Sequence, residues 1–69
     1  MELKEQIQTV YQNFKLSTNN NTQACLEFLN WLHYEKDQAK YLYDMEGLTQ
    51  IEKSYISQLL EGKISKIEK

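Results

Sequence analysis

Arginine and proline are absent from this chain of 69 residues, which also has only one cysteine, one histidine and two glycines. A single cysteine cannot form an internal disulfide, and one cysteine with one histidine cannot complete the ligand set of a structural zinc site. Domains of this size bury only about 60% of their unfolded surface and are usually stabilised by a disulfide, a bound metal or a partner chain. We therefore expect stability to come from helix packing or from association with another chain.

The chain also lacks long apolar runs and an excess of positive charge. No run approaches the roughly 18 residues of a membrane span, and the charged start, Met1 to Gln6, lacks the apolar stretch of a secretory signal. We expect a cytoplasmic protein with no membrane partner, which agrees with a single unpaired cysteine. The net charge is −2 and arginine, the preferred residue for phosphate and base contacts, is missing, so composition argues against a generic nucleic-acid binder. The many Lys, Asn, Ile, Glu and Tyr residues are typical of AT-rich coding, as in a low-GC bacterium, its phage or a plasmid.

The sequence predicts one all-α domain over residues 1–69, built from three helices. The first has an apolar stripe with the spacing i, i+4, i+7, i+11, formed by Leu3, Ile7, Val10 and Phe14. It should end near Ser17, because the asparagines at 19–21 favour a loop. Asn21 or Thr22 can then cap the second helix by accepting a hydrogen bond from an unpaired backbone N–H.

The second helix should run from Thr22 to about Glu46, with Gly47 as the residue that ends it. A helix of this length would be about 36 Å long. Thr49 and Glu52 have the capping-box spacing and predict the start of a third helix, which Gly62 either ends or interrupts. The apolar side of that third helix comprises Ile51, Tyr55, Ile56, Leu59 and Leu60. The predicted fold is therefore a long central helix flanked by two shorter helices.

The predicted central helix is unusually apolar, because 13 of the 22 residues from Ala24 to Met45 are hydrophobic. On a helical projection they form two stripes and leave a polar face. The first stripe comprises Ala24, Cys25, Phe28, Leu29, Leu32, Ala39, Leu42 and Tyr43. The second has the heptad spacing i, i+3, i+7, i+10, i+14 and comprises Trp31, Tyr34, Gln38, Tyr41 and Met45. The polar face holds Asn30, His33, Asp37, Lys40 and Asp44.

Two interpretations of the second stripe stay open. In the first, the outer helices cover both stripes and the aromatic residues belong to the core. In the second, the stripe binds a partner protein or a second copy of the chain, since Trp, Tyr and Met are enriched at interface centres. Gln38 would then fix the register by a hydrogen bond between chains. We expect a small interaction module that regulates or inhibits its partner, with Trp31, Tyr34, Gln38, Tyr41 and Met45 as the binding residues.

The sequence carries no enzyme signature. Cys25 and His33 would lie about 80° and about 12 Å apart on one helix, too far for a nucleophile and its base. His33 and Asp37, four residues apart, are too few for a tight metal site and are interpreted as a weak exposed pair. A helical chain of this length also leaves little room for a pocket of about 300 Å³. We therefore expect neither catalysis nor a metal or other cofactor.

The C-terminal part of the chain suggests an alternative function. The residues Leu48 to Lys53, with Ile56, Leu59 to Lys63 and Ser65 to Glu68, resemble the opening of a sigma-factor region-4-like helix–turn–helix. The stretch from Ser54 to Lys63 is similar to the recognition helix of phage-repressor-type domains. No recognition helix follows the first pattern within this chain, and no scaffold helix precedes the second in the expected place. The resemblance implies a dimeric DNA-binding regulator that contacts phosphates through Lys53, Lys63, Lys66 and Lys69.

Overall fold

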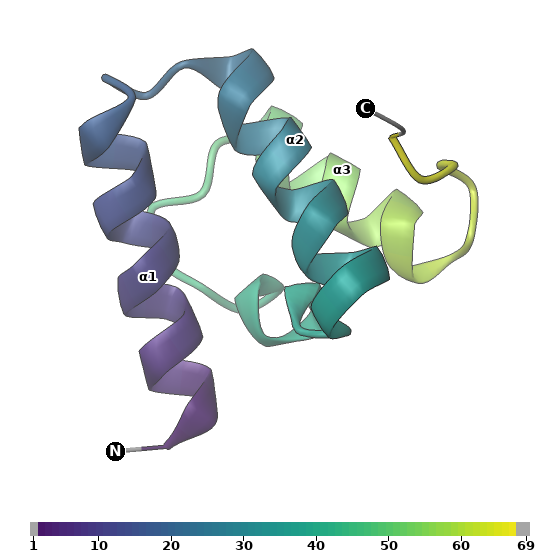
Figure 1. Cartoon of the computed structure of the whole chain (residues 1–69), viewed down its shortest axis with the longest axis horizontal. Helices are drawn as coiled ribbons and strands as arrows, with labels where there is room; N and C mark the ends of the chain where they lie inside the picture. Colours follow the sequence, from purple (N-terminus) through teal and green to yellow (C-terminus); the bar gives the residue numbers. More distant parts are fainter. Residues whose placement is uncertain (1, 68–69) are drawn as a thin grey trace.

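The computed structural model describes residues 2–67 and shows an all-helical chain (Figure 1). The elements follow in the order α1 (Leu3–Ser17), α2 (Thr22–Trp31), a π-helical turn η1 (Leu32–Lys36), a short 3₁₀ helix η2 (Ala39–Leu42) and α3 (Gln50–Leu60). Over the same residues no strand is present, which confirms the all-α prediction. No helix within this part of the chain combines the length and the apolar character needed to cross a membrane.

The three α-helices are arranged around the irregular segment between α2 and α3 (Figure 1). Helix α1 packs against η2, α2 packs against α3, and η2 also contacts α3. The radius of gyration is 11.1 Å, which matches the value of about 11 Å for a compact chain of this length. The buried core comprises Ile7, Tyr11, Cys25, Leu29, Leu32, Ala39, Leu42, Met45, Ile56 and Leu59.

Local capping signals set the ends of the helices. The Asn21 side chain accepts a hydrogen bond from a backbone N–H in the first turn of α2, and Thr49 with Glu52 forms a complete capping box on α3. At the opposite ends, Asn19 and Gly62 follow α1 and α3 with φ angles of 56° and 76°, and each closes a Schellman turn. The predicted asparagine loop, the capping box and the role of Gly62 as a helix end are therefore confirmed.

The long central helix predicted over residues 22–46 is not found. Asp37 adopts a left-handed conformation, with φ 53° and ψ 40°, and the next N–H bonds back to the first carbonyl of η1 at 3.0 Å. A straight helix of that length would measure about 36 Å, more than the longest dimension of the folded chain, 29 Å. The break turns Ala39, Leu42 and Met45 back into the core, where all three are buried. Apolar burial thus outweighs the continuation of the helix.

The buried face of α1 also differs from the predicted stripe. Ile7 and Tyr11 are buried and Phe14 is half-buried, whereas Leu3 and Val10 are 45% and 49% exposed. The hydroxyl of Tyr11 has a buried acceptor on α3, so this amphipathic side chain can enter the core without leaving a polar group unpaired. The predicted stripe therefore included Val10, which is exposed, and left out Tyr11, which is buried.

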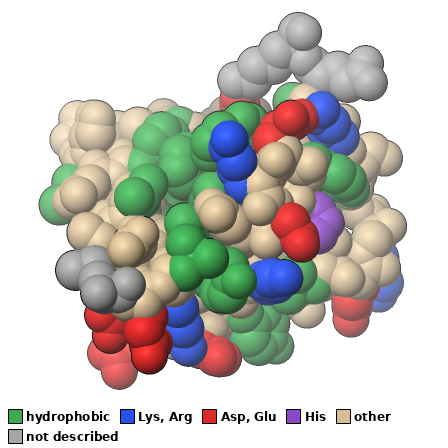
Figure 2. Space-filling view, turned by 60° about the horizontal axis from the view of Figure 1, so that its bottom comes forward, with side chains coloured by type: hydrophobic (Ala, Val, Ile, Leu, Met, Phe, Trp, Pro, Cys, Tyr) green, Lys and Arg blue, Asp and Glu red, His purple; other side chains and the backbone are tan. Residues whose placement is uncertain are grey.

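Several large hydrophobic side chains stay exposed on the surface. They are Leu3, Val10, Leu16, Trp31, Tyr34, Tyr43, Ile51, Leu60 and Ile67. On the face seen in Figure 2, hydrophobic side chains lie among lysine and acidic side chains. Scattered exposure of this kind is normal for a small protein and implies no partner. A binding site is indicated only where exposed apolar groups line a hollow.

Candidate partner-binding groove

The five residues of the predicted heptad stripe do not share one face. Trp31 and Tyr34 lie on adjacent turns at the end of α2 and in η1, and they are 45% and 38% exposed. Met45 is a core residue with 7% of its surface exposed, while Gln38 and Tyr41 are half-buried after the break in the helix. The heptad spacing would align these side chains only on one continuous helix, which ends after η1. The core interpretation therefore applies to Met45, whereas Trp31 and Tyr34 face the solvent.

Trp31 belongs instead to a row of aromatic rings that connects α1 with α2. Phe14 of α1 stacks on Phe28 of α2 with ring centroids 4.3 Å apart, and Phe28 lies 5.7 Å from the ring of Trp31. Such aromatic contacts contribute about 0.5–1.5 kcal/mol each beyond the area they bury. Because Phe28 is held on both sides, Trp31 is presented to solvent on a preformed surface.

A groove of about 490 Å³ runs along this row of rings, and we call it the aromatic groove. It is lined by Phe14, Ala24, Glu27, Phe28, Asn30, Trp31, Glu35, Lys66 and Ile67. Aromatic walls with a few polar groups are typical of binding sites, and the volume lies within their usual range. The expectation that so short a chain has little room for a pocket was wrong, because the walls come from three separate segments: α1, α2 with η1, and the C-terminal residues.

Charged side chains of both signs border the aromatic groove. Lys66 forms an ion pair with Glu35, and its hydrogen bond holds the pKa of the Glu35 carboxyl below the ordinary value. The ammonium of Lys36 lies 5.5 Å from the centroid of the Trp31 ring, a cation–π geometry that attracts even at exposed sites. Glu27 accepts a hydrogen bond from Gln23 one turn earlier on α2. A segment that enters the groove can therefore be held by charge as well as by apolar contact.

Asn30 lies at the edge of the groove and is only 1% exposed. Its Nδ2 donates to the Tyr55 hydroxyl at 3.1 Å and to the Ser65 carbonyl at 3.0 Å. Its Oδ1 accepts from the backbone N–H of Ile67 at 2.9 Å. The sequence pattern had placed Asn30 on a solvent-facing polar side, and this was wrong. The position of Asn30 in the sequence could have indicated its burial, because it lies within an apolar helical stretch. A buried side-chain amide must form hydrogen bonds.

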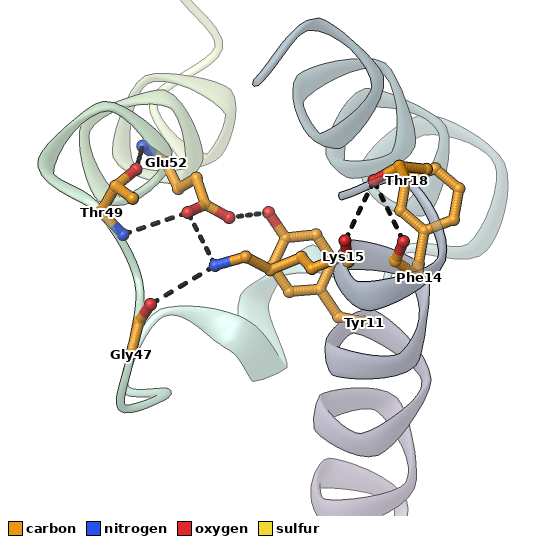
Figure 3. A network of polar contacts seen from close by, with 7 residues as sticks. All are labelled: Tyr11, Phe14, Lys15, Thr18, Gly47, Thr49 and Glu52. Carbon is orange, nitrogen blue, oxygen red and sulfur yellow. Dashed lines mark hydrogen bonds and ion pairs between the residues drawn. The ribbon is translucent and has the colours of Figure 1, made fainter. Parts of the chain in front are cut away.

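A second polar cluster joins α1 to α3 (Figure 3), and we call it the junction clamp. The Glu52 carboxylate, only 3% exposed, accepts hydrogen bonds from the Tyr11 hydroxyl, from the Lys15 ammonium at 2.9 Å and from the Thr49 N–H at 3.1 Å. Burial alone would raise the pKa of Glu52, but these hydrogen bonds hold it below the ordinary value. Burial, with the bond to Glu52, raises the pKa of Tyr11. Neither group is poised to exchange a proton near neutral pH, so the cluster acts as a structural clamp.

The remaining candidate groups for chemistry are dispersed. Cys25 is 2% exposed and belongs to the apolar core. The rings of His33 and Tyr34 make an edge-to-face contact. Asp37 forms an ion pair with Lys40 at 3.5 Å and not with His33. Between residues 2 and 67, no three His, Cys, Asp or Glu side chains are grouped to hold a metal ion.

The lysines of the DNA-binding alternative are partly neutralised in the fold. Lys53 is exposed on α3, whereas Lys63 and Lys66 each pair with a glutamate. Lys69 lies outside the described residues. Over residues 2–67, no observation specifically favours a phosphate-binding surface at these positions.

Comparison with known proteins identifies no relative. No family model matches this chain, and no curated protein and no solved structure is significantly similar to it. A function therefore has to be inferred from the aromatic groove and from the groups that border it.

Proposed function

We propose that this protein is a non-enzymatic interaction module that binds a partner protein through the aromatic groove and thereby regulates or inhibits that partner. The exposure of Trp31 carries the proposal, because 45% of this side chain faces solvent while its ring packs against Phe28. Tryptophan is among the residues most enriched at the energetic centres of interfaces. An exposed tryptophan that lines a hollow is better suited to a partner than to the stability of the isolated fold.

The chemistry of the groove favours an apolar segment as its occupant. Phe14, Phe28 and Trp31 form a preorganised wall, so a docking side chain meets rings that need little further ordering. Apolar surface removed from water stabilises such a complex by about 25 cal/mol per Å² before the costs of association. Of the residues predicted from the sequence, Trp31 lines this proposed site, whereas Tyr34 does not and Met45 is buried.

Peptide selection on the immobilised full-length protein tests this proposal directly. A library of short peptides displayed on phage is selected for binding, and the selected peptides are then made synthetically. Trp31 is the only tryptophan, so a peptide in the groove should shift its fluorescence to shorter wavelength and reduce quenching by acrylamide. Trp31→Ala should lower the affinity of the protein for these peptides by about thirtyfold, the loss expected of an interface hot spot.

Leu16→Ala is the matched control, because Leu16 is a 72% exposed hydrophobic residue on α1 that does not line the aromatic groove. It should bind the selected peptides as tightly as the wild type. Circular dichroism during urea unfolding separates lost binding from lost folding in both variants. Equal binding by Trp31→Ala and the wild type would contradict the proposal, as would equal losses in the two variants.

A further inference from the structure

The residues after α3 turn back, bend at Ile64 and reach Asn30 of α2 (Figure 1). Gly62, with φ 76°, makes the turn that directs this segment away from the helix axis. We call residues Ile64–Ile67 the C-terminal strap. It has no regular secondary structure of its own, so its position depends on side chains of other elements.

Two side chains bind the strap through its main chain. Asn30 donates to the carbonyl of Ser65 and accepts from the N–H of Ile67, while the Tyr34 hydroxyl donates to the carbonyl of Ile64. Pairing with a carbonyl and with the N–H two residues later recognises an extended backbone, whichever side chains it carries. Because Asn30 is almost fully buried, leaving its amide unpaired would cost about 1–3 kcal/mol per group. This position therefore requires an extended peptide, or water in its place.

The side chains of the strap add a sequence preference. Lys66 pairs with Glu35, Ile64 packs against the core, and Ile67 lines the aromatic groove. Ser65 is exposed, so its side chain contributes little to selection. The preferred occupant is thus an extended segment with the pattern apolar, any residue, basic, apolar.

The strap is held by few contacts and its release breaks no helix. Three hydrogen bonds between side chains and its backbone, one half-exposed ion pair and the apolar contacts of Ile64 and Ile67 hold it in place. Exposed ion pairs are weak, and openings with so few contacts occur locally without global unfolding. A segment on a short tether acts as a ligand at roughly millimolar effective concentration. Another peptide can displace it only by making additional contacts.

We propose that Asn30, Tyr34 and Glu35 form a seat for an extended segment of a partner protein with this pattern, and that the C-terminal strap is the tethered competitor of that segment. The proposal deepens the proposed function and rests on it for the existence of a partner protein. A partner segment gains over the strap by placing more apolar side chains along the aromatic groove. A second copy of this chain has no such advantage, because its own strap already fills its own seat.

A capped peptide with the sequence of residues 62–67 is the probe, and the full-length protein is the receptor. Lys66→Glu places a carboxylate against Glu35, which loosens the strap and leaves the seat unchanged. This variant should bind the peptide about fivefold more tightly than the wild type, as measured by titration of the ¹⁵N-labelled protein. Lys63→Glu is the matched control, because Lys63 pairs with Glu61 outside the seat. It should bind the peptide as the wild type does.

Two further measurements assign the binding to the seat. A peptide in which glutamate replaces the second lysine should bind poorly to the Lys66→Glu protein and regain affinity when Glu35→Lys is added. Tyr34→Phe in the Lys66→Glu protein removes one hydrogen bond and should weaken the original peptide about fivefold. The side-chain amide resonance of Asn30 should shift during each productive titration.

Several results would overturn the proposal. They are the absence of Asn30 shifts at millimolar peptide, equal affinity of the wild type and Lys66→Glu, or a gain in affinity in Lys63→Glu. A concentration-dependent dimer of Lys66→Glu in sedimentation would also overturn it, by making a second copy the occupant. The two proposals fail separately. If the selected peptides require Trp31 but bind equally to the wild type and to the strap variants, the groove is supported and the seat is refuted. If the probe peptide binds at the seat but no selected peptide depends on Trp31, the seat is supported and the groove is refuted.

Discussion

The junction of α1 with α3 and the flank of α2 each join distant segments through one buried polar side chain. Glu52 does this at the junction and Asn30 at the flank, and they are 3% and 1% exposed. Glu52 is charged and receives donors from two other helix-anchored side chains, Tyr11 and Lys15. Asn30 is neutral, and two of its three partners are backbone groups of the C-terminal strap, which has no regular structure.

This difference decides which region can open. Separation of the junction clamp would leave the carboxylate of Glu52 and the ammonium of Lys15 without their partners in a poorly hydrated place, which is strongly unfavourable. Release of the strap unpairs the neutral amide of Asn30 and the exposed Lys66–Glu35 ion pair, and water can replace the partners of both. We therefore expect the junction to open only with the whole fold and the flank to open locally. A binding site for an exchangeable segment belongs on the flank.

The largest expected effect is that of removing the charged centre of the junction clamp. Glu52→Ala removes the acceptor of Tyr11 and Lys15 and half of the α3 capping box. The free energy of unfolding should fall by about 3 kcal/mol, as for other buried pairs that lose one partner. Urea unfolding followed by circular dichroism measures this loss. Glu61→Ala, at an exposed pair, is the control and should change stability by less than about 0.5 kcal/mol.

Acid should weaken the junction more than the flank. The folded pKa of Glu52 lies below its ordinary value of 4.5, so the carboxylate contributes stability above the unfolded pKa, and this contribution is lost as pH falls through the folded pKa. The free energy of unfolding should therefore decline below about pH 5. Glu52→Gln should flatten this decline. Glu35→Gln is the matched control, since the pKa of Glu35 is also lowered but its pair with Lys66 is exposed. An unchanged acid decline in Glu52→Gln would refute this assignment.

Local signals in the sequence predicted the helix ends but not the break in the middle. Asn21 as a cap, Thr49 with Glu52 as a capping box and Gly62 as a helix end all act within a few residues. Their roles can therefore be predicted without a tertiary structure. Asp37 ends a helical run that has no proline or glycine. Its left-handed conformation follows from the burial of later residues, which no local pattern encodes.

The candidate site was predicted only in part for the same reason. The helical projection put Trp31 and Tyr34 on one stripe and left open whether that stripe is core or interface; both lie before the break and are exposed. Met45 lies after the break and enters the core. Phe14 joined the site through a contact between helices, and Asn30 through a strap at the far end of the sequence. Neither partner is implied by residue spacing.

A smaller global effect, with a larger local one, is expected at the flank. Asn30→Ala deprives Ser65, Ile67 and Tyr55 of their hydrogen-bond partner. The free energy of unfolding should fall by about 2 kcal/mol. The loss is not larger because the backbone groups of the strap can form hydrogen bonds with water instead. The rate of amide hydrogen exchange at Ile67 should rise by more than the lower free energy of unfolding can account for. Equal acceleration in the core of α3 would show instead that the flank opens only with the whole fold.

The smallest effects come from the two glycines, and they provide the cleanest comparison of the two regions. Gly47 and Gly62 have φ angles of 88° and 76°, and a Cβ at either would meet no atom within 4 Å. Alanine at each position should therefore cost about 1 kcal/mol through backbone conformation alone. Gly47 lies beside the junction, where its carbonyl is 3.4 Å from Lys15, whereas Gly62 directs the strap. Similar losses in urea unfolding, with faster exchange at Ile67 only in Gly62→Ala, would show that the flank opens independently of the junction. Faster exchange in both variants would show that the two regions open together.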